Sequence, residues 1–236
     1  MATVLPNVTV AELVAERPSR SRVFEKLGID YCCGGGKTLA AVCEKKGIDI
    51  AEALKEIEVE DSRAAGKELD ELTGMSLSDL IDHILREHHN YLKRELPRLQ
   101  ALADRVAERH GERDARLIEL AKLHQSFASE LESHMMKEER ILFPEIRQME
   151  ETGVTAGAPG PIAMKIRVME AEHDDAGEAM ERMSELTDGF AIHDECCNKH
   201  RALLQGLKEM VENMHQHVSA ENNILFPRAR AMEAGK

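Results

Sequence analysis

The stretch HMMKEERILFP at residues 134–144 returns 83 residues later as HVSAENNILFP at residues 217–227. Both stretches read H-x3-E-x2-I-L-F-P. Residues four apart lie on the same face of a helix, so each copy places a histidine beside a glutamate. A carboxylate inside a helical bundle is costly unless it is paired or bound to a metal. A hydrogen-bonded His–Glu pair on a partly solvated face would explain one copy, but two matched copies indicate a shared site.

The sequence around the two copies predicts a helical bundle. Breaks in the apolar pattern give four expected helices, at residues 76–109, 113–150, 162–187 and 195–234. Apolar residues recur in steps of three and four along them, and the stripe of the second helix contains His134, Glu138 and Ile141. Four long helices with short connections predict an all-α, up-down-up-down bundle.

A separate unit precedes the bundle. Residues 1–60 predict a small helical domain whose short helices, unstable alone, flank the glycine-rich turn DYCCGGG at residues 30–36. Residues 61–75 are polar, contain two glycines and predict a linker. The bundle domain then occupies residues 76–236.

The composition restricts the class of protein. The net charge of −13 argues against nucleic acid or an anionic membrane as the main partner. The sequence has no apolar run of about 18 residues and no basic segment followed by an apolar stretch at its start, so we expect neither a membrane span nor a secretory signal. Five cysteines are an odd number, which argues against a disulfide scaffold. We therefore expect a cytoplasmic protein.

The first and third helices supply further candidates for the core site. His173 lies on the apolar stripe of the third helix. In the first helix, His88 begins a register that turns polar, whereas His89 begins a leucine-rich register, so His89 is the expected inward residue. His89 and His134 are 45 residues apart, and His173 and His217 are 44 apart. Each half of the bundle thus contains a histidine followed, about 45 residues later, by His-x3-Glu.

These six residues suit two metal ions better than one. Four histidines and two carboxylates that each bind both ions supply about eight bonds, or roughly four per ion. An oxo or hydroxo bridge would add a fifth bond and leave an open position. Such a donor set suits iron, whereas a closed structural zinc site usually has four ligands and uses thiolates; ligand type alone leaves manganese and zinc open. The predicted ligands are His89, His134, Glu138, His173, His217 and Glu221.

At these residues the chain resembles a known family. The bundle is similar to the hemerythrin-like di-iron domain, and the whole chain resembles the RIC family of di-iron proteins, which repair iron–sulfur clusters. The resemblance covers nearly the entire length and rests on DYCCGGG (30–36), SHMMKEERILFP (133–144), MEAEHDDAGE (169–178) and HVSAENNILFP (217–227). It implies two iron ions at the same six residues, with Glu138 and Glu221 as bridging carboxylates.

The resemblance implies that the protein restores iron–sulfur clusters after nitrosative or oxidative damage. Damaged iron–sulfur cluster proteins would be its partners, and nitric oxide or oxygen its small ligands. Two mechanisms stay open, namely delivery of iron to a damaged cluster and reduction of nitric oxide at a diferrous site. The alternative is a hemerythrin-like carrier or sensor of oxygen or nitric oxide without repair activity. The thiol-bearing N-terminal unit favours repair, because a plain carrier does not need it.

Cys32 and Cys33 are adjacent, and three glycines follow them. Glycine permits positive φ and close backbone approach, and a thiolate at the start of the following helix would be stabilised. We interpret the pair as redox or iron-handling thiols that dock against the bundle; two small residues in a tight turn are the alternative. The resemblance implies that Glu172, which precedes His173, lines the access path. The small thiol-bearing domain also leaves a homodimer open.

Overall fold

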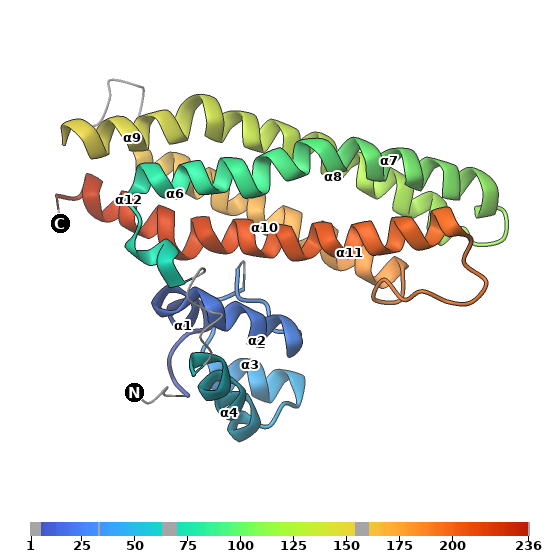
Figure 1. The fold of residues 1–236 in the computed structure, drawn as a ribbon, viewed down its shortest axis with the longest axis horizontal. Helices are drawn as coiled ribbons and strands as arrows, with labels where there is room; N and C mark the ends of the chain where they lie inside the picture. The colour runs from blue at the N-terminus through green and yellow to red at the C-terminus, as the bar shows by residue number, and fades with distance from the viewer. Residues whose placement is uncertain (1–5, 33, 63–69, 154–160, 236) are drawn as a thin grey trace.

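The computed structural model describes residues 6–32, 34–62, 70–153 and 161–235, and its regular elements are helices (Figure 1). Four long helices lie side by side, and the short N-terminal helices form a group against the C-terminal one. The predicted all-α fold, a four-helix bundle preceded by a small helical domain, is confirmed. None of the helices in the described ranges is long and apolar enough to cross a bilayer.

Three of the four bundle helices contain a short π-helical segment. The first bundle helix comprises α6 (Leu77–Ile84), η4 (Leu85–His89) and α7 (Asn90–His110). The second comprises α8 (Arg116–Lys137), η5 (Glu138–Leu142) and α9 (Phe143–Thr152). The third is α10 (Ile162–Leu186). The fourth comprises α11 (Asn198–Ser219), η6 (Ala220–Leu225) and α12 (Phe226–Glu233).

The repeated I-L-F-P explains two of the π-helical segments. Pro144 and Pro227 are the second residues of α9 and α12. Proline has no N–H, and its ring collides with the carbonyl four residues earlier, so regular helical bonding fails there. The preceding turn widens, and Phe143 donates to the carbonyl of Glu138, five residues back, rather than four. No proline lies in or just after η4, and nothing in the structure explains its wide turn.

The wide turn also corrects one expectation from the apolar stripe. Ile141 was predicted to face the core, but it is 48% exposed, and Leu142 is buried instead. A π-helical turn contains one extra residue, so the side chains that follow it point in other directions than those of a regular α-helix would. Ile224, at the equivalent position of the second copy, is only 4% exposed. It lines a small cavity with Pro18 and Tyr31 of the N-terminal unit, so that unit covers the second copy and leaves the first open.

A glutamate six residues after each proline caps another helix. Glu150 accepts hydrogen bonds from the first two backbone N–H groups of α6. Glu233 accepts from the first two of α10. A carboxylate at a helix start satisfies free N–H groups and interacts favourably with the helix dipole. The glutamate that follows each copy of the repeated phrase therefore caps the start of the preceding helix in its own half of the bundle.

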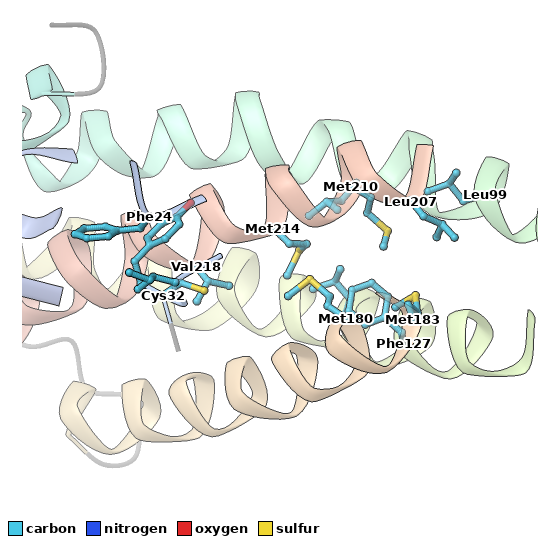
Figure 2. Close-up of a cluster of buried hydrophobic side chains, with 14 of the residues drawn as sticks. Phe24, Cys32, Leu99, Phe127, Met180, Met183, Leu207, Met210, Met214 and Val218 are labelled. Atoms are coloured by element: carbon cyan, nitrogen blue, oxygen red, sulfur yellow. The ribbon is translucent and has the colours of Figure 1, made fainter. Parts of the chain in front are cut away.

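Two clusters of buried apolar side chains fill the bundle. One contains Leu80, Phe143 and Leu225, near the chain's C-terminal end. The other occupies the opposite part, where Figure 2 shows methionines and leucines of several helices meeting, and it continues through Val218 to Cys32 of the N-terminal unit. The predicted metal ligands lie where the two clusters meet along the bundle helices. The polar site is thus enclosed by apolar layers on both sides.

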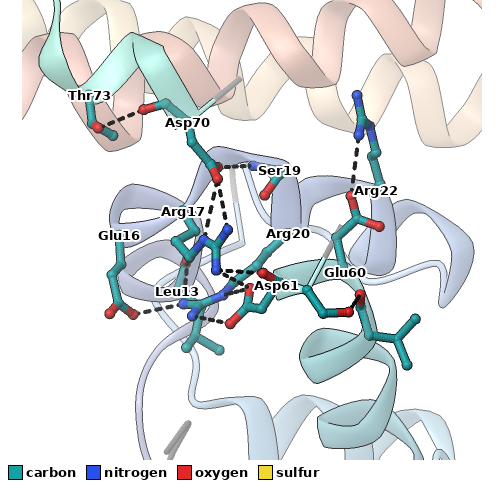
Figure 3. Close-up of polar contacts among 12 residues, drawn as sticks. Leu13, Glu16, Arg17, Ser19, Arg20, Arg22, Glu60, Asp61, Asp70 and Thr73 are labelled. Atoms are coloured by element: carbon teal, nitrogen blue, oxygen red, sulfur yellow. Dashed lines mark hydrogen bonds and ion pairs between the residues drawn. The ribbon is translucent and has the colours of Figure 1, made fainter. Parts of the chain in front are cut away.

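The N-terminal unit consists of α1 (Val10–Glu16), η1 (Pro18–Arg20), α2 (Ser21–Lys26), α3 (Leu39–Lys46) and α4 (Ile50–Asp61), and η3 (Glu71–Gly74) leads into the bundle. A buried arginine joins its ends (Figure 3). Arg20 makes two bonds to the Asp61 carboxylate, at 2.9 and 2.8 Å, and one to Glu16 at 2.7 Å. Asp70 accepts from Arg17 and from the backbone of Ser19, which ties the start of η3 to the same unit.

Replacing Arg20 with alanine should lower the free energy of unfolding by about 3 kcal/mol, because the Asp61 carboxylate would lose its two-pronged partner in a largely buried setting. Urea unfolding followed by circular dichroism measures this. Arg105→Ala is the matched control, since Arg105 and Glu108 form an exposed pair and their loss should change stability by less than about 0.5 kcal/mol. Equal effects of the two substitutions would contradict this reading of Arg20.

Candidate metal centre

The structure brings all six predicted ligands into one buried cluster. Each of these residues is at most 3% exposed. Their ligand atoms form two groups, within each of which all atoms lie within 4.8 Å of one another, so that either group could hold a metal ion. The first group contains His89, Glu138, His217 and Glu221, and the second contains His134, Glu138, His173 and Glu221. Both glutamates belong to both groups.

The glutamates stand between two pairs of histidines. His89 comes from the first bundle helix and His217 from the fourth, and their Nε2 atoms are 3.2 Å apart. His134 and His173 come from the second and third helices, with Nε2 atoms 3.1 Å apart. Each glutamate offers one oxygen to each pair. The oxygen-to-Nε2 distances are 3.3 Å from Glu138 to His89, 3.3 Å to His134, 3.1 Å from Glu221 to His217 and 3.2 Å to His173.

Hydrogen bonds on the outer side orient three of the four imidazoles. Nδ1 of His89 lies 2.8 Å from Glu139, Nδ1 of His134 lies 2.9 Å from Glu172, and Nδ1 of His173 lies 2.9 Å from the side-chain oxygen of Asn222. Carboxylate and amide oxygens only accept hydrogen bonds, so each Nδ1 must donate. In a neutral imidazole the Nε2 lone pair then points into the cluster. Metal-binding histidines are usually held in this way.

The cluster fits a metal on its own chemistry. Both oxygens of Glu138 and one of Glu221 are buried without a hydrogen bond in the described part of the chain. Two neutral Nε2 atoms about 3 Å apart, with lone pairs facing, repel each other unless a cation or proton lies between them. Two nitrogens bound to one ion at about 2.1 Å, a right angle apart, would also be about 3 Å apart. Orphaned acceptors and converging lone pairs both call for positive charge.

Electrostatics in the cluster favour the same conclusion. Burial and the Glu221 carboxylate both act to raise the pKa of Glu138, but His134 and His89 outweigh them and hold that pKa below its ordinary value. Burial acts to lower the pKa of His134, whereas Glu138 and Glu221 raise it more strongly, to about 9. Burial keeps the pKa of His217 below its ordinary value. The two carboxylates therefore stay charged and gather positive charge around them.

Two further buried histidines lie outside both groups. His88 is buried despite its polar register; its ring stacks on that of His217 at 5.3 Å, and its Nδ1 lies 3.3 Å from the amide oxygen of Asn213. Burial lowers the pKa of His88 to about 3, so it stays neutral beside the cluster. His124, on the ligand stripe, instead pairs with Gln100 at 2.7 Å.

A cleft of about 390 Å³ between α8 and α10 leads to one histidine pair. Its lining includes Leu131, His134, His173 and Glu172. The Glu172 carboxylate, 29% exposed, binds His134 on one side and the ammonium of Lys137 on the other. The structure therefore places Glu172 at the mouth of a path to the cluster, where it also orients a histidine.

The cysteine loop differs from expectation in two respects. Cys32 does not begin a helix, because the next helix starts at Leu39; instead Asp30 accepts hydrogen bonds from the backbone N–H of Cys32 at 3.0 Å and from its thiol at 3.4 Å. Gly34, the glycine directly after the cysteines, does not have a positive φ. It instead lets the backbone pass close to the Asp30 carboxylate, because a Cβ on Gly34 would lie 2.7 Å from it. Cys33 lies outside the described residues.

Sequence reasoning missed some of the residues that orient the cluster. Glu139 and Asn222 each follow one of the shared glutamates directly, and each binds the Nδ1 of a histidine on another helix. The signal that could have found them is their place in the repeat, since a polar residue after the glutamate returns in both copies. Their targets could not be read from the sequence, because they depend on how the helices are rotated.

Known proteins support this picture. A family model described as the hemerythrin HHE cation binding domain matches residues 80–229, and a domain of unknown function, DUF542, matches residues 6–61. The chain is 38% identical over 225 residues to the iron–sulfur cluster repair protein YtfE of Citrobacter koseri, covering 95% of this chain and 97% of that protein. It is 35% identical over 220 residues to a probable iron–sulfur cluster repair protein of Haemophilus influenzae, covering 93% and 95%. The chain therefore belongs to the family of iron–sulfur cluster repair proteins with a hemerythrin HHE cation-binding domain.

Proposed function

We propose that the cluster holds two iron ions bridged by an oxo or hydroxo group. The two four-residue groups that share both glutamates carry this proposal. Each ion would take two histidines and one oxygen from each glutamate, so both carboxylates would bridge. Histidine and carboxylate donors with positions left open suit iron. The proposed ligands are His89, His134, Glu138, His173, His217 and Glu221.

The ions would supply exchangeable coordination positions for redox chemistry or iron release. The protein's own contribution is positioning and exclusion of water. Glu139 and Glu172 fix their histidines with Nε2 inward, and Phe143 and Phe226 stand against the rings of His89 and His173. The cleft beside Glu172 would give small molecules or ions a way in. Lys137, paired with Glu172, lines that entrance.

We propose that the protein repairs iron–sulfur clusters damaged by nitrosative or oxidative stress, with the damaged proteins as its clients. The description of its relatives as iron–sulfur cluster repair proteins supports this, because the similarity covers 95% and 93% of the chain. In the proposed division, residues 1–60 carry the thiol loop, residues 61–75 form the linker and residues 76–236 hold the metals. The packing of the Cys32 loop against the metal-bearing helices favours repair over a plain carrier of oxygen or nitric oxide.

Metal content is the first consequence. The iron-loaded protein should contain about two irons per chain, and Glu138→Ala or Glu221→Ala should contain less than about half of that, because each substitution removes a ligand from both ions. Added Fe²⁺ should raise the unfolding temperature of the parent but of neither variant. Elemental analysis and thermal unfolding followed by circular dichroism measure these changes.

Glu145→Ala is the control for that experiment. Glu145 is also buried and lies seven residues after Glu138, but it pairs with Lys165 outside the cluster. It should keep the metal content of the parent. Equal iron in the parent and in all three variants would refute the proposed site.

Transfer of iron is the second consequence. With dithionite present as the electron donor in every arm, protein loaded with ⁵⁷Fe should restore a [4Fe–4S] enzyme that has lost one iron after exposure to nitric oxide, and the restored cluster should contain ⁵⁷Fe. A chelator that traps free ferrous ions should abolish the effect of a ferrous salt but reduce that of the loaded protein only slightly. Mössbauer spectroscopy of the re-isolated enzyme measures the label. Restoration without ⁵⁷Fe in the cluster would contradict donation of iron.

A further inference from the structure

The two copies of the repeated phrase differ at the residue that follows the shared glutamate. The first copy has Glu139 and the second has Asn222. Both accept a hydrogen bond from Nδ1 of a candidate ligand histidine, His89 at 2.8 Å and His173 at 2.9 Å. The two halves of the bundle therefore use the same position for the same task but with different chemistry.

The remaining contacts of these two residues show what the difference achieves. Glu139 is bound by the ammonium of Lys93, at 2.6 and 2.8 Å, on the surface of the bundle. Asn222 instead donates from its Nδ2 to the backbone carbonyl of Cys32, at 3.1 Å. A carboxylate has no hydrogen to donate, so a glutamate or aspartate at position 222 could not make this bond. The amide thus joins a candidate metal ligand to the cysteine loop.

The neighbouring residue of the second copy serves the same docking. Arg140 of the first copy is exposed, whereas its counterpart Asn223 is buried and donates to the carbonyl of Tyr31 at 3.1 Å. The Tyr31 ring meets His215 edge-on at 6.1 Å. Two consecutive asparagines therefore hold two consecutive carbonyls of the loop. The second copy is adapted to the N-terminal unit, and the first is not.

The orientation of the Asn222 amide depends on the loop. The Cys32 carbonyl only accepts, so it holds the NH₂ end of Asn222 outward and the oxygen toward His173. That oxygen requires Nδ1 of His173 to donate, which leaves the Nε2 lone pair for the cluster. Without the loop the amide can rotate and present NH₂ to Nδ1, which favours the tautomer that carries its proton on Nε2 and cannot bind a metal there. Glu139 has no such alternative, because a carboxylate only accepts.

We propose that Asn222 is a positioning residue that couples docking of the cysteine loop to metal binding through His173. The inference rests on the proposed function only in taking His173 as a ligand. Docking of the loop favours the metal-binding tautomer of His173. Undocking of the loop weakens metal binding only through this histidine, in the second half of the bundle. Coupling of this kind is reciprocal, so metal binding must in turn stabilise the docked loop, in which Cys32 is buried.

The test uses Co²⁺ as the probe metal and iodoacetamide as the probe of Cys32, which is 6% exposed when docked. Peptide mass spectrometry gives the alkylation rate at Cys32, and visible absorption gives Co²⁺ affinity. In the parent, Co²⁺ should slow alkylation. Asn223→Ala, which touches no candidate ligand, should speed alkylation about fivefold, the size expected for one lost hydrogen bond, and should weaken Co²⁺ binding.

Asn222→Asp separates the two tasks of the amide. This variant should speed alkylation of Cys32 to the same extent, and Co²⁺ should no longer change the alkylation rate. It should keep the Co²⁺ affinity of the parent, since a carboxylate at position 222 still fixes His173. Arg140→Ala, the counterpart of Asn223→Ala in the first copy, should change neither measurement. The proposal fails if Asn223→Ala speeds alkylation with no change in Co²⁺ affinity, or if Asn222→Asp leaves Cys32 protected by Co²⁺.

These measurements are independent of cluster repair. A protein that shows the coupling with Co²⁺ but transfers no iron would retain this inference and lose the proposed function. A protein that repairs clusters, but in which Co²⁺ binding and alkylation of Cys32 do not affect each other, would retain the proposed function and lose this inference.

Discussion

The burial of two carboxylates at one level of a helical bundle is the constraint on which the rest of the structure depends. Glu138 and Glu221 are fully buried, and the charge of Glu221 opposes ionisation of Glu138. Charged groups in such a place need positive partners. Four histidines surround them, outer acceptors turn three of those histidines inward, and apolar clusters close the bundle above and below. The centre is built to be completed by cations.

The same eleven-residue phrase meets that constraint in both halves of the bundle. Its histidine and glutamate are candidate metal ligands, while its proline widens the turn that follows the glutamate. A second glutamate, six residues after the proline, caps the start of the preceding helix in the same half of the bundle. The phrase and the glutamate that follows it thus set chemistry, helix geometry and the capping of a helix start, which accounts for the return of H, E, I, L, F and P at the same spacing. At one position where the two copies differ, Glu139 and Asn222, the difference follows the N-terminal unit, which covers only the second copy.

Much of this could be predicted from the sequence, and the failures have physical causes. Helical periodicity and the equal spacings of about 45 residues were enough to place the helices and to choose His89 over His88, because burial at three- and four-residue steps is a local property. Ile141 was misplaced because a π turn breaks that periodicity. His88 is buried by stacking on His217 of another helix, and the apolar periodicity of a single helix cannot predict such a contact. The loop contacts of Asn222 and Asn223 were invisible for the same reason, since they join residues about 190 positions apart.

The central claim is that both glutamates are shared by two ions in one centre. Mössbauer spectra of the ⁵⁷Fe-loaded, oxidised protein, recorded at low temperature with and without an applied magnetic field, test it most directly. Two ferric ions joined by shared bridges couple antiferromagnetically, so the account predicts a diamagnetic ground state for nearly all of the bound iron. Magnetically isolated high-spin ferric ions, at one or two per chain, would contradict it.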